Sequence, residues 1–271
     1  MKKSFSFSIT FFLLLPVFVN GQHNEIGIFY GKSYYLGDLN PSRQFAMARF
    51  SYGGMYRFNI DEHKSLRLSG FYGSVEADDA IIGYNKDRNL HFKSSIIEVS
   101  MQGEINFLPF ESGNSNKKHT PYIFGGIGGF KFNPQARSDD GQWHDLQPLG
   151  TEGQFSDLYP QREPYSLYAL SFLFGMGYKF NISKYFTGGL EWGMRRTTTD
   201  YLDDVSSTYP NPDDLSPLAS EFSDRSLSGG DKTNMMRGNP DNNDWYSFAG
   251  FILTYNLPNW RERSCPYSPY D

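Results

Sequence analysis

Polar and apolar residues alternate strictly in several stretches of this chain, and residues 185–195 show the pattern best. Among the odd-numbered positions are Glu191 and Arg195. The even-numbered positions include Phe186, Leu190, Trp192 and Met194. Successive side chains of a β-strand point to opposite faces, so this period of two predicts a strand with one apolar and one charged face.

The same alternation recurs often enough to predict an all-β fold. The predicted strands are 25–35, 46–59, 66–73, 96–107, 120–134, 172–181, 185–195 and 245–257. After residue 21, no apolar stretch approaches the roughly 20 residues that a membrane-spanning helix needs. Eight strands form an even number, as single-chain outer-membrane barrels require.

Charged residues share the polar faces of these strands. A soluble β-sandwich would have to desolvate them in its core, whereas an eight-stranded barrel has a narrow interior that such side chains fill. On a lipid-facing surface, each Lys or Arg near the midplane would cost about 2–4 kcal/mol. We therefore predict an eight-stranded antiparallel transmembrane β-barrel of the outer membrane. Its nine predicted interior charges are Arg49, Arg57, Arg67, Glu98, Glu104, Lys131, Lys179, Glu191 and Arg195.

The connections between the predicted strands support this topology. Odd-numbered connections are mostly long and even-numbered ones mostly short, which is typical of barrels with long extracellular loops, short periplasmic turns and periplasmic termini. The exception is the polar turn 111–119, which carries Lys117 and Lys118. It is either a periplasmic contact surface or an ordinary solvated turn. Asp61 and Glu62 lie in another predicted periplasmic turn.

The first 21 residues have the features of a secretory signal. Lys2 and Lys3 precede an apolar run over 11–19, and small residues occupy 19 and 21. We expect three segments, which are a signal peptide (1–21), an outer-membrane barrel (22–257) and a periplasmic C-terminal tail (258–271).

Composition narrows the functional classes. The net charge of −5 becomes −7 when Lys2 and Lys3 leave with the signal, which argues against a nucleic-acid partner. Aromatic residues make up 17% of the chain, yet its mean hydropathy is −0.55. Half-lipid-facing strands together with long polar loops would produce both values. The single Cys265 cannot form an internal disulfide.

Candidate catalytic and cofactor chemistry is sparse. The five histidines show no pair at metal-ligand spacing, and no acidic pair lies in a calcium-loop pattern. The glycine run 125–129 lies inside an alternating strand, so it is no phosphate loop. A lipid-hydrolysing site of Ser156, His144 and Asp145 at the barrel rim is an alternative, although residue types without geometry are weak evidence. We predict no enzyme activity, no cofactor and no metal.

Particular loop segments carry information beyond periodicity. They are GDLNP (37–41), YIFGGIGGFKFNP (122–134), PLGTEGQ (148–154), TTTDYLDDVSSTYP (197–210), SDRS (223–226), RGN (237–239) and DWY (244–246). In these segments the chain resembles the PorG family, small outer-membrane barrels of the type IX secretion system. The resemblance implies a non-enzymatic subunit that associates with a periplasmic ring-forming lipoprotein and its companion, in protein export and gliding motility.

Partner contacts are therefore expected in the periplasmic turns and the tail, unless the tail is simply a disordered end. The candidates are Asp61, Glu62, Lys117, Lys118, Trp260, Arg261 and Arg263. The alternative function is a surface-exposed adhesin or ligand-binding barrel, with its determinants in loops 136–162 and 198–243. A pore is disfavoured, because a charged and filled eight-stranded barrel leaves little lumen.

Overall fold

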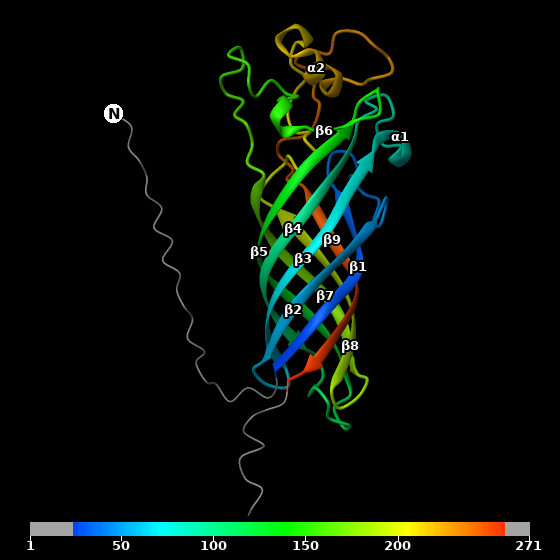
Figure 1. Cartoon of the computed structure of the whole chain (residues 1–271), viewed down its shortest axis with the longest axis vertical. Coiled ribbons are helices and arrows are strands. Elements are labelled where there is room, and N and C mark those ends of the chain that lie inside the picture. The colour runs from blue at the N-terminus through cyan, green and yellow to red at the C-terminus, as the bar shows by residue number, and fades with distance from the viewer. Residues whose placement is uncertain (1–23, 258–271) are drawn as a thin grey trace, which may run out of the picture.

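Eight long antiparallel strands close into a tall barrel (Figure 1) in the computed structural model, which describes residues 24–257. The ring consists of β1 (Asn24–Leu36), β2 (Arg49–Asn59), β3 (Lys64–Asp78), β4 (His91–Asn106), β5 (His119–Arg137), β7 (Tyr168–Asn181), β8 (Phe186–Thr197) and β9 (Trp245–Asn256). Strand β1 pairs with β9 as well as β2, which closes the ring and leaves no open sheet edge. The predicted eight-stranded antiparallel barrel is confirmed.

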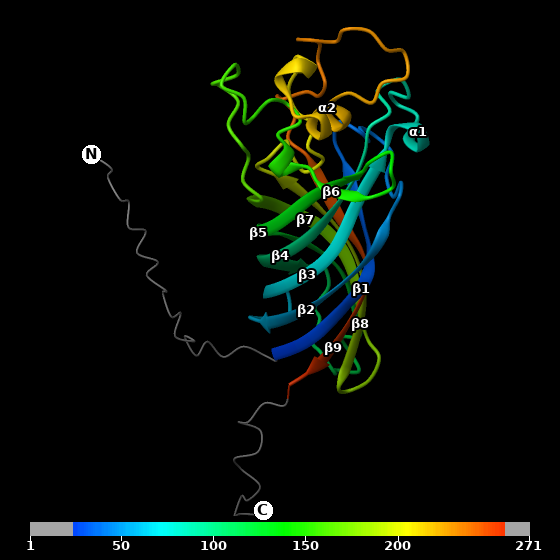
Figure 2. The same cartoon turned by 45° about the horizontal axis from the view of Figure 1, so that its top comes forward.

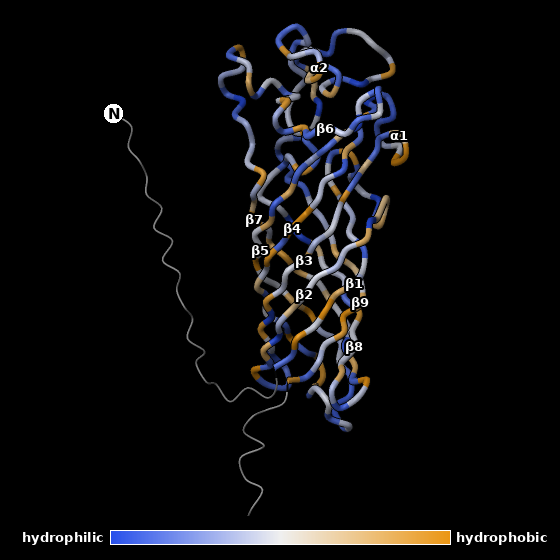
Figure 3. Tube along the Cα trace, viewed as in Figure 1, coloured by the Kyte–Doolittle hydropathy of each residue, from blue (hydrophilic) through white to orange (hydrophobic). Residues whose placement is uncertain are grey.

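The barrel wall is apolar outside and polar inside. Along β4, buried and exposed residues alternate without a break from Phe92 to Asn106. Ile97, Val99 and Ile105 face outward and are more than half exposed, whereas Glu98 and Glu104 are buried. In Figure 3 hydrophobic positions recur along the strands, and the loops beyond them are mainly hydrophilic. This inside-out pattern is that of a barrel whose wall meets lipid.

The two ends of the barrel differ. One end, which we call the terminal end, holds the start of β1, the end of β9 and the connections after β2, β4 and β7 (Figure 1). At the loop end, the longer connections fold across the barrel (Figure 2). These connections contain α1 (Asp79–Ile82), β6 (Trp143–Asp145), the 3-10 helices η1 (Gln147–Leu149) and η2 (Pro212–Asp214), and α2 (Pro217–Ser223). Within residues 24–257, no helix is long and apolar enough to cross a membrane.

Several strand ends differ from the sequence prediction. Strand β2 begins at Arg49 and not at residue 46, because Phe45 and Met47 adopt left-handed backbone angles (φ 60° and 49°). Residues 44–47 form a turn that contacts β1, where the Tyr34 hydroxyl donates to Gln44. The predicted loop 136–162 begins as a hairpin, since β6 pairs with the end of β5.

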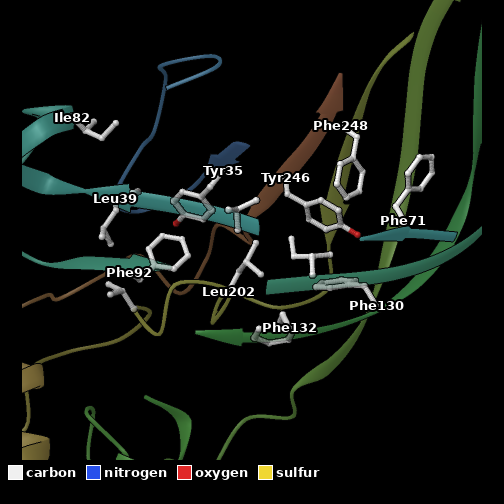
Figure 4. Packing of buried hydrophobic residues seen from close by; sticks show 14 of the residues in the cluster. Tyr35, Leu39, Phe71, Ile82, Phe92, Phe130, Phe132, Leu202, Tyr246 and Phe248 are labelled. Atoms are coloured by element: carbon white, nitrogen blue, oxygen red, sulfur yellow. The ribbon is translucent and has the colours of Figure 1, made fainter. Parts of the chain in front are cut away.

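The loop-end half of the interior is filled by aromatic side chains (Figure 4). The rings of Phe71 and Phe248 stack 5.1 Å apart, and Tyr246 packs 5.1 Å from Phe130. Phe132 is fully buried beside them, although the sequence predicted that this face of β5 points to lipid. Because the aromatic face of β5 fills the interior, the face with Ile123, Ile127 and Lys131 is the outward one.

Candidate functional site: a filled barrel with two closed ends

A buried ion-pair network crosses the barrel interior, and Glu104 of β4 is its centre. Its carboxylate accepts from three cations on three other strands, at 3.0 Å from Arg57 Nε, 3.2 Å from Arg67 Nε and 2.9 Å from Lys179 Nζ. All four side chains are at most 2% exposed. One carboxylate therefore ties β2, β3, β4 and β7 together.

Three further carboxylates complete the network. Glu25 pairs with Arg57 at 2.8 Å, Glu191 with Arg67 at 2.6 Å, and Glu98 with Arg195 at 3.1 Å. The hydroxyls of Thr254, Tyr122 and Tyr246 also donate to Glu25, Glu191 and Glu98, respectively. The network thus contains four cations and four carboxylates, so its formal charge is zero.

This balance corrects the sequence prediction of six cations and three carboxylates. The structure places seven of the nine predicted residues inside, but Lys131 and Arg49 were assigned wrongly. Lys131 faces outward because the aromatic face of β5 points inward. Arg49 begins β2 at the loop-end rim, where its side chain is 56% exposed and pairs with Glu76. Sequence reasoning also missed Glu25, which shares the inward face of β1 with Phe29 but was not counted among the interior charges.

The buried side chains leave little space in these layers. The space beside Arg57, Tyr122 and Lys179 has no room for a water molecule. Above it, the Arg195 guanidinium lies 4.8 Å from the centre of the Phe248 ring, directly under the aromatic layer. The interior is consequently a packed core, as expected for eight strands.

The β4–β5 connection closes the terminal end. We call residues 107–118 the mouth plug. Phe110 is 4% exposed and lies under Lys179, while Ser112 donates to Glu25 inside the barrel. The Asn181 amide donates to the carbonyls of Glu111, Asn114 and Lys117 at 2.9–3.3 Å. The predicted polar turn is therefore folded into the mouth of the barrel.

The predicted contact residues at this end have unequal environments. Lys117 pairs with Glu62 and, at 3.5 Å, with Glu111, so it fastens the plug to the β2–β3 turn. Asp61 accepts from the backbone amides of His63 and Lys64 within that turn. Lys118 is exposed. Trp260, Arg261 and Arg263, like the signal peptide, lie outside the described residues.

We expect Asn181→Ala to loosen the mouth plug while the barrel stays folded. The substitution removes the donor to three carbonyls and the acceptor for the Gly113 amide at 3.1 Å. Such a loss costs about 1–3 kcal/mol. Amide hydrogen exchange of residues 107–118 should accelerate accordingly. Asn116→Ala, at an exposed plug position, is the control; equal protection in both variants would contradict the assignment.

At the loop end, the long connections form a compact cap around the buried Arg237. Its guanidinium pairs with Glu152 at 3.0 Å and donates to the carbonyls of Asp204 and Ser223. Glu152 also accepts from the amides of Ser206 and Ser207. Two connections that are far apart in sequence, β5–β7 and β8–β9, are thereby joined.

A second buried arginine joins the β1–β2 and β3–β4 connections to the cap. Arg88 makes a bidentate pair with Asp79 at 2.8 Å and donates to the carbonyls of Arg237 and Asp38. Nearby, the Tyr35 hydroxyl of β1 lies 2.5 Å from Asp203 and 2.8 Å from Asp244. The loop segments singled out in the sequence, 37–41, 148–154, 197–210, 237–239 and 244–246, meet in this network.

Burial strongly raises the pKa of four aspartates in the cap. It raises the pKa of Asp200 to about 8 and that of Asp204 to about 6, against an ordinary value near 4. The charges of Asp38, Glu152 and Asp241 raise the Asp200 pKa further. Burial also raises the pKa values of Asp203 and Asp244. These four aspartates therefore bind a proton more tightly than a free carboxyl does.

This predicts a cap that loosens as pH rises. A carboxyl with a raised pKa keeps its proton in the folded cap but loses it above about pH 4 when unfolded, so its stabilising effect declines between about pH 4 and pH 8. We expect the free energy of cap opening to fall by about 1–3 kcal/mol between pH 6 and pH 8. Hydrogen exchange, corrected for intrinsic rates, measures it. Asp200→Asn should flatten the dependence, and an unchanged slope would contradict this origin.

The alternative hydrolase site is not assembled. The His144 ring contacts the Ser138 hydroxyl at 3.2 Å, and Asp145 accepts from Asn133 and Gln135. No hydrogen bond joins His144 to Ser156 among the described residues. Within the same residues, no group of three or more His, Cys, Asp or Glu is arranged to hold a metal ion.

Comparison with protein families gives one match. The model of the domain of unknown function DUF6089 matches residues 3–148, which is more than half of the 271 residues. The chain belongs to the DUF6089 family. A comparison with curated proteins found no match.

Among solved structures, this DUF6089 chain is similar to three bacterial barrels. The N-terminal β-barrel domain of Pseudomonas aeruginosa OprF is 14% identical, with 88% of this chain and 99% of that chain covered and a TM-score of 0.38. Yersinia pestis Ail, in complex with the heparin analogue sucrose octasulfate, is 11% identical, with 87% and 98% covered and a TM-score of 0.41. P. aeruginosa OprG is 10% identical, with 89% and 100% covered and a TM-score of 0.41. Likeness at this level assigns no activity.

Proposed function

We propose that this DUF6089 chain is a non-enzymatic outer-membrane subunit of the type IX secretion system, which anchors or assembles the periplasmic lipoprotein ring. In this proposal the terminal end faces the periplasm and the loop end faces outward. The observation that carries it is the packed interior. A barrel that is filled by a neutral ion-pair network and an aromatic layer is not a pore for ions or solutes. Its function is then carried out at its two ends.

The cap supports the family resemblance behind this proposal. Five of the seven segments that resemble PorG are separated by up to about 200 residues in the chain, yet they meet around Arg88, Arg237 and Tyr35. Their residue types are explained by one folded network.

Contacts with the ring are assigned to the terminal end. Lys118 is exposed on the mouth plug beside the half-buried Glu62 and Lys117, and β9 ends at the same end of the barrel. The plug is held by Asn181 and Glu25, so it presents a fixed surface. A fixed surface binds a partner without an ordering cost.

The test is purification of tagged protein from detergent-solubilised outer membranes, with mass spectrometry of its stoichiometric companions. We expect the ring-forming lipoprotein and its companion to co-purify. Lys118→Glu should lower their recovery, whereas Lys86→Glu, an exposed change at the loop end, should not. A clean monomeric barrel in mild detergent would contradict the proposal.

A surface adhesin or ligand-binding barrel is the second candidate. The observation that favours it is the folded cap, on which Phe155, Leu158 and Leu227 are each more than half exposed. Exposed apolar side chains on a polar frame are typical of binding surfaces. Under this alternative, Phe155→Ser with Leu158→Ser would abolish surface binding and leave ring recovery unchanged.

A further inference from the structure

The outer wall of the barrel carries cations that face the membrane and not the interior network. Four of them, towards the loop end, each lie over an aromatic ring. Lys32 lies 5.4 Å from the centre of Phe50, Lys93 5.9 Å from Trp143, Lys131 5.7 Å from Tyr168 and Arg196 5.9 Å from Trp245.

These four outward cations differ from the buried ones because they lack a carboxylate partner among the described residues. None of the four forms an ion pair with a carboxylate of residues 24–257. Glu76 lies opposite Lys93 across the β3–β4 pair, but its carboxylate pairs with Arg49 at 2.6 Å. Every cation of the interior network, in contrast, contacts a carboxylate.

Lys131 also borders a groove of about 490 Å³ in the outer wall. The floor of the groove is Gly129 of β5, where an added Cβ would meet nothing within 4 Å. Val99 of β4 and Leu170 of β7 flank Gly129 in register. Two residues further along β5, Ile97 and Tyr168 flank Lys131 in the same way. The groove is an apolar trough with an ammonium group beside it.

We propose that this groove binds lipid A of the outer leaflet, with a phosphate on Lys131 and an acyl chain over Gly129. The trough lies on the lipid-facing wall, so its occupant must be an amphiphile. An outward lysine with no carboxylate is costly in a membrane unless an anion meets it. Lipid A supplies both the phosphate and the chain, and the choice of leaflet rests on the orientation given under Proposed function.

The second contact to the phosphate would come from the tyrosine. Tyr168 is 67% exposed, and its ring already orients the Lys131 ammonium. An ammonium held over a ring keeps its remaining donors free for an oxyanion. Lys131 is therefore a positioned donor and not a freely moving surface lysine.

Native mass spectrometry of the full chain in detergent, titrated with lipid A, tests this. Removing one lysine near an anionic surface costs about 1 kcal/mol, so Lys131→Gln should weaken lipid A binding about fivefold. Gly129→Leu should weaken it at least as much by filling the trough. The open space at the Cβ position of residue 129 accommodates the new side chain without disturbing the barrel.

Two matched variants serve as controls. Lys184→Gln removes a lysine that lies over Tyr185 at the terminal end, and Gly125→Leu fills an outward position of β5 that does not line the groove. Both should bind lipid A as the unmodified protein does. Equal binding by all four variants would overturn the proposal. A Lys131-dependent preference for phosphatidylglycerol over lipid A would also overturn it, because it would place an anionic phospholipid there.

Discussion

Replacing Glu104 with Gln is expected to destabilise the barrel by about 3–5 kcal/mol, the range for breaking a buried ion pair. The carboxylate is the shared partner of Arg57, Arg67 and Lys179. Gln leaves the buried Lys179 without a carboxylate, and Arg57 and Arg67 each lose one of their two acidic partners. The side-chain volume hardly changes, so packing contributes little to the difference. Urea unfolding of the protein in lipid vesicles, followed by tryptophan fluorescence, measures the free energy of unfolding.

Glu62→Gln is the matched control for Glu104→Gln. Glu62 also pairs with a lysine, but both side chains are 32% exposed at the terminal end. Half-solvated pairs contribute about 0–1 kcal/mol. A loss at Glu104 no larger than the loss at Glu62 would show that the interior charges are solvated and that the barrel is not sealed.

Replacing Arg237 with Met is expected to open the cap and leave the barrel closed. Met retains most of the apolar volume but leaves the fully buried Glu152 without its cation and frees the carbonyls of Asp204 and Ser223. Breaking such a pair costs about 3–5 kcal/mol, which corresponds to an increase in cap hydrogen exchange of at least about 100-fold. Amides of β4 and β8 should keep their protection.

Arg225→Gln is the control within the cap. Arg225 pairs with the largely exposed Asp139 and with Glu221 on α2. Exchange in residues 148–154 and 204–210 should barely change in this variant. If Arg237→Met leaves those amides protected, the cap is held by its apolar contacts and not by the arginine.

Strand number and most strand faces could be predicted from the sequence because a lipid-facing wall imposes a period of two. Glu98, Glu104, Lys179 and Glu191 fall on faces opposed by exposed apolar residues, and the structure buries all four. In β5 both faces consist mainly of apolar residues and glycine. The periodicity therefore predicted a strand but did not show which of its faces points inward. Lys131 then suggested the wrong face.

The cap and the mouth plug could not be predicted from the periodicity of the sequence. Arg237 and Glu152 are 85 residues apart, and Ser112 reaches Glu25 across 87 residues. Nothing in the local sequence indicates such partners, because hydrogen bonds between loops follow no period. Only the structure therefore showed whether loops 136–162 and 198–243 are exposed or folded. Phe110, an aromatic residue just before a polar turn, was the one local signal of a buried plug.

The ion-pair network has a consequence for how the protein enters its membrane. Its partners come from strands distant in the chain, since Lys179 meets Glu104 of β4 and Glu191 of β8 meets Arg67 of β3. A partly inserted sheet would carry these charges into hydrocarbon unpaired, and a one-residue slip of one strand would turn the charges of that strand towards lipid. Insertion and barrel closure should then occur in one concerted step. The charges that stabilise the closed barrel raise the free energy of partly inserted intermediates, because they are unpaired there.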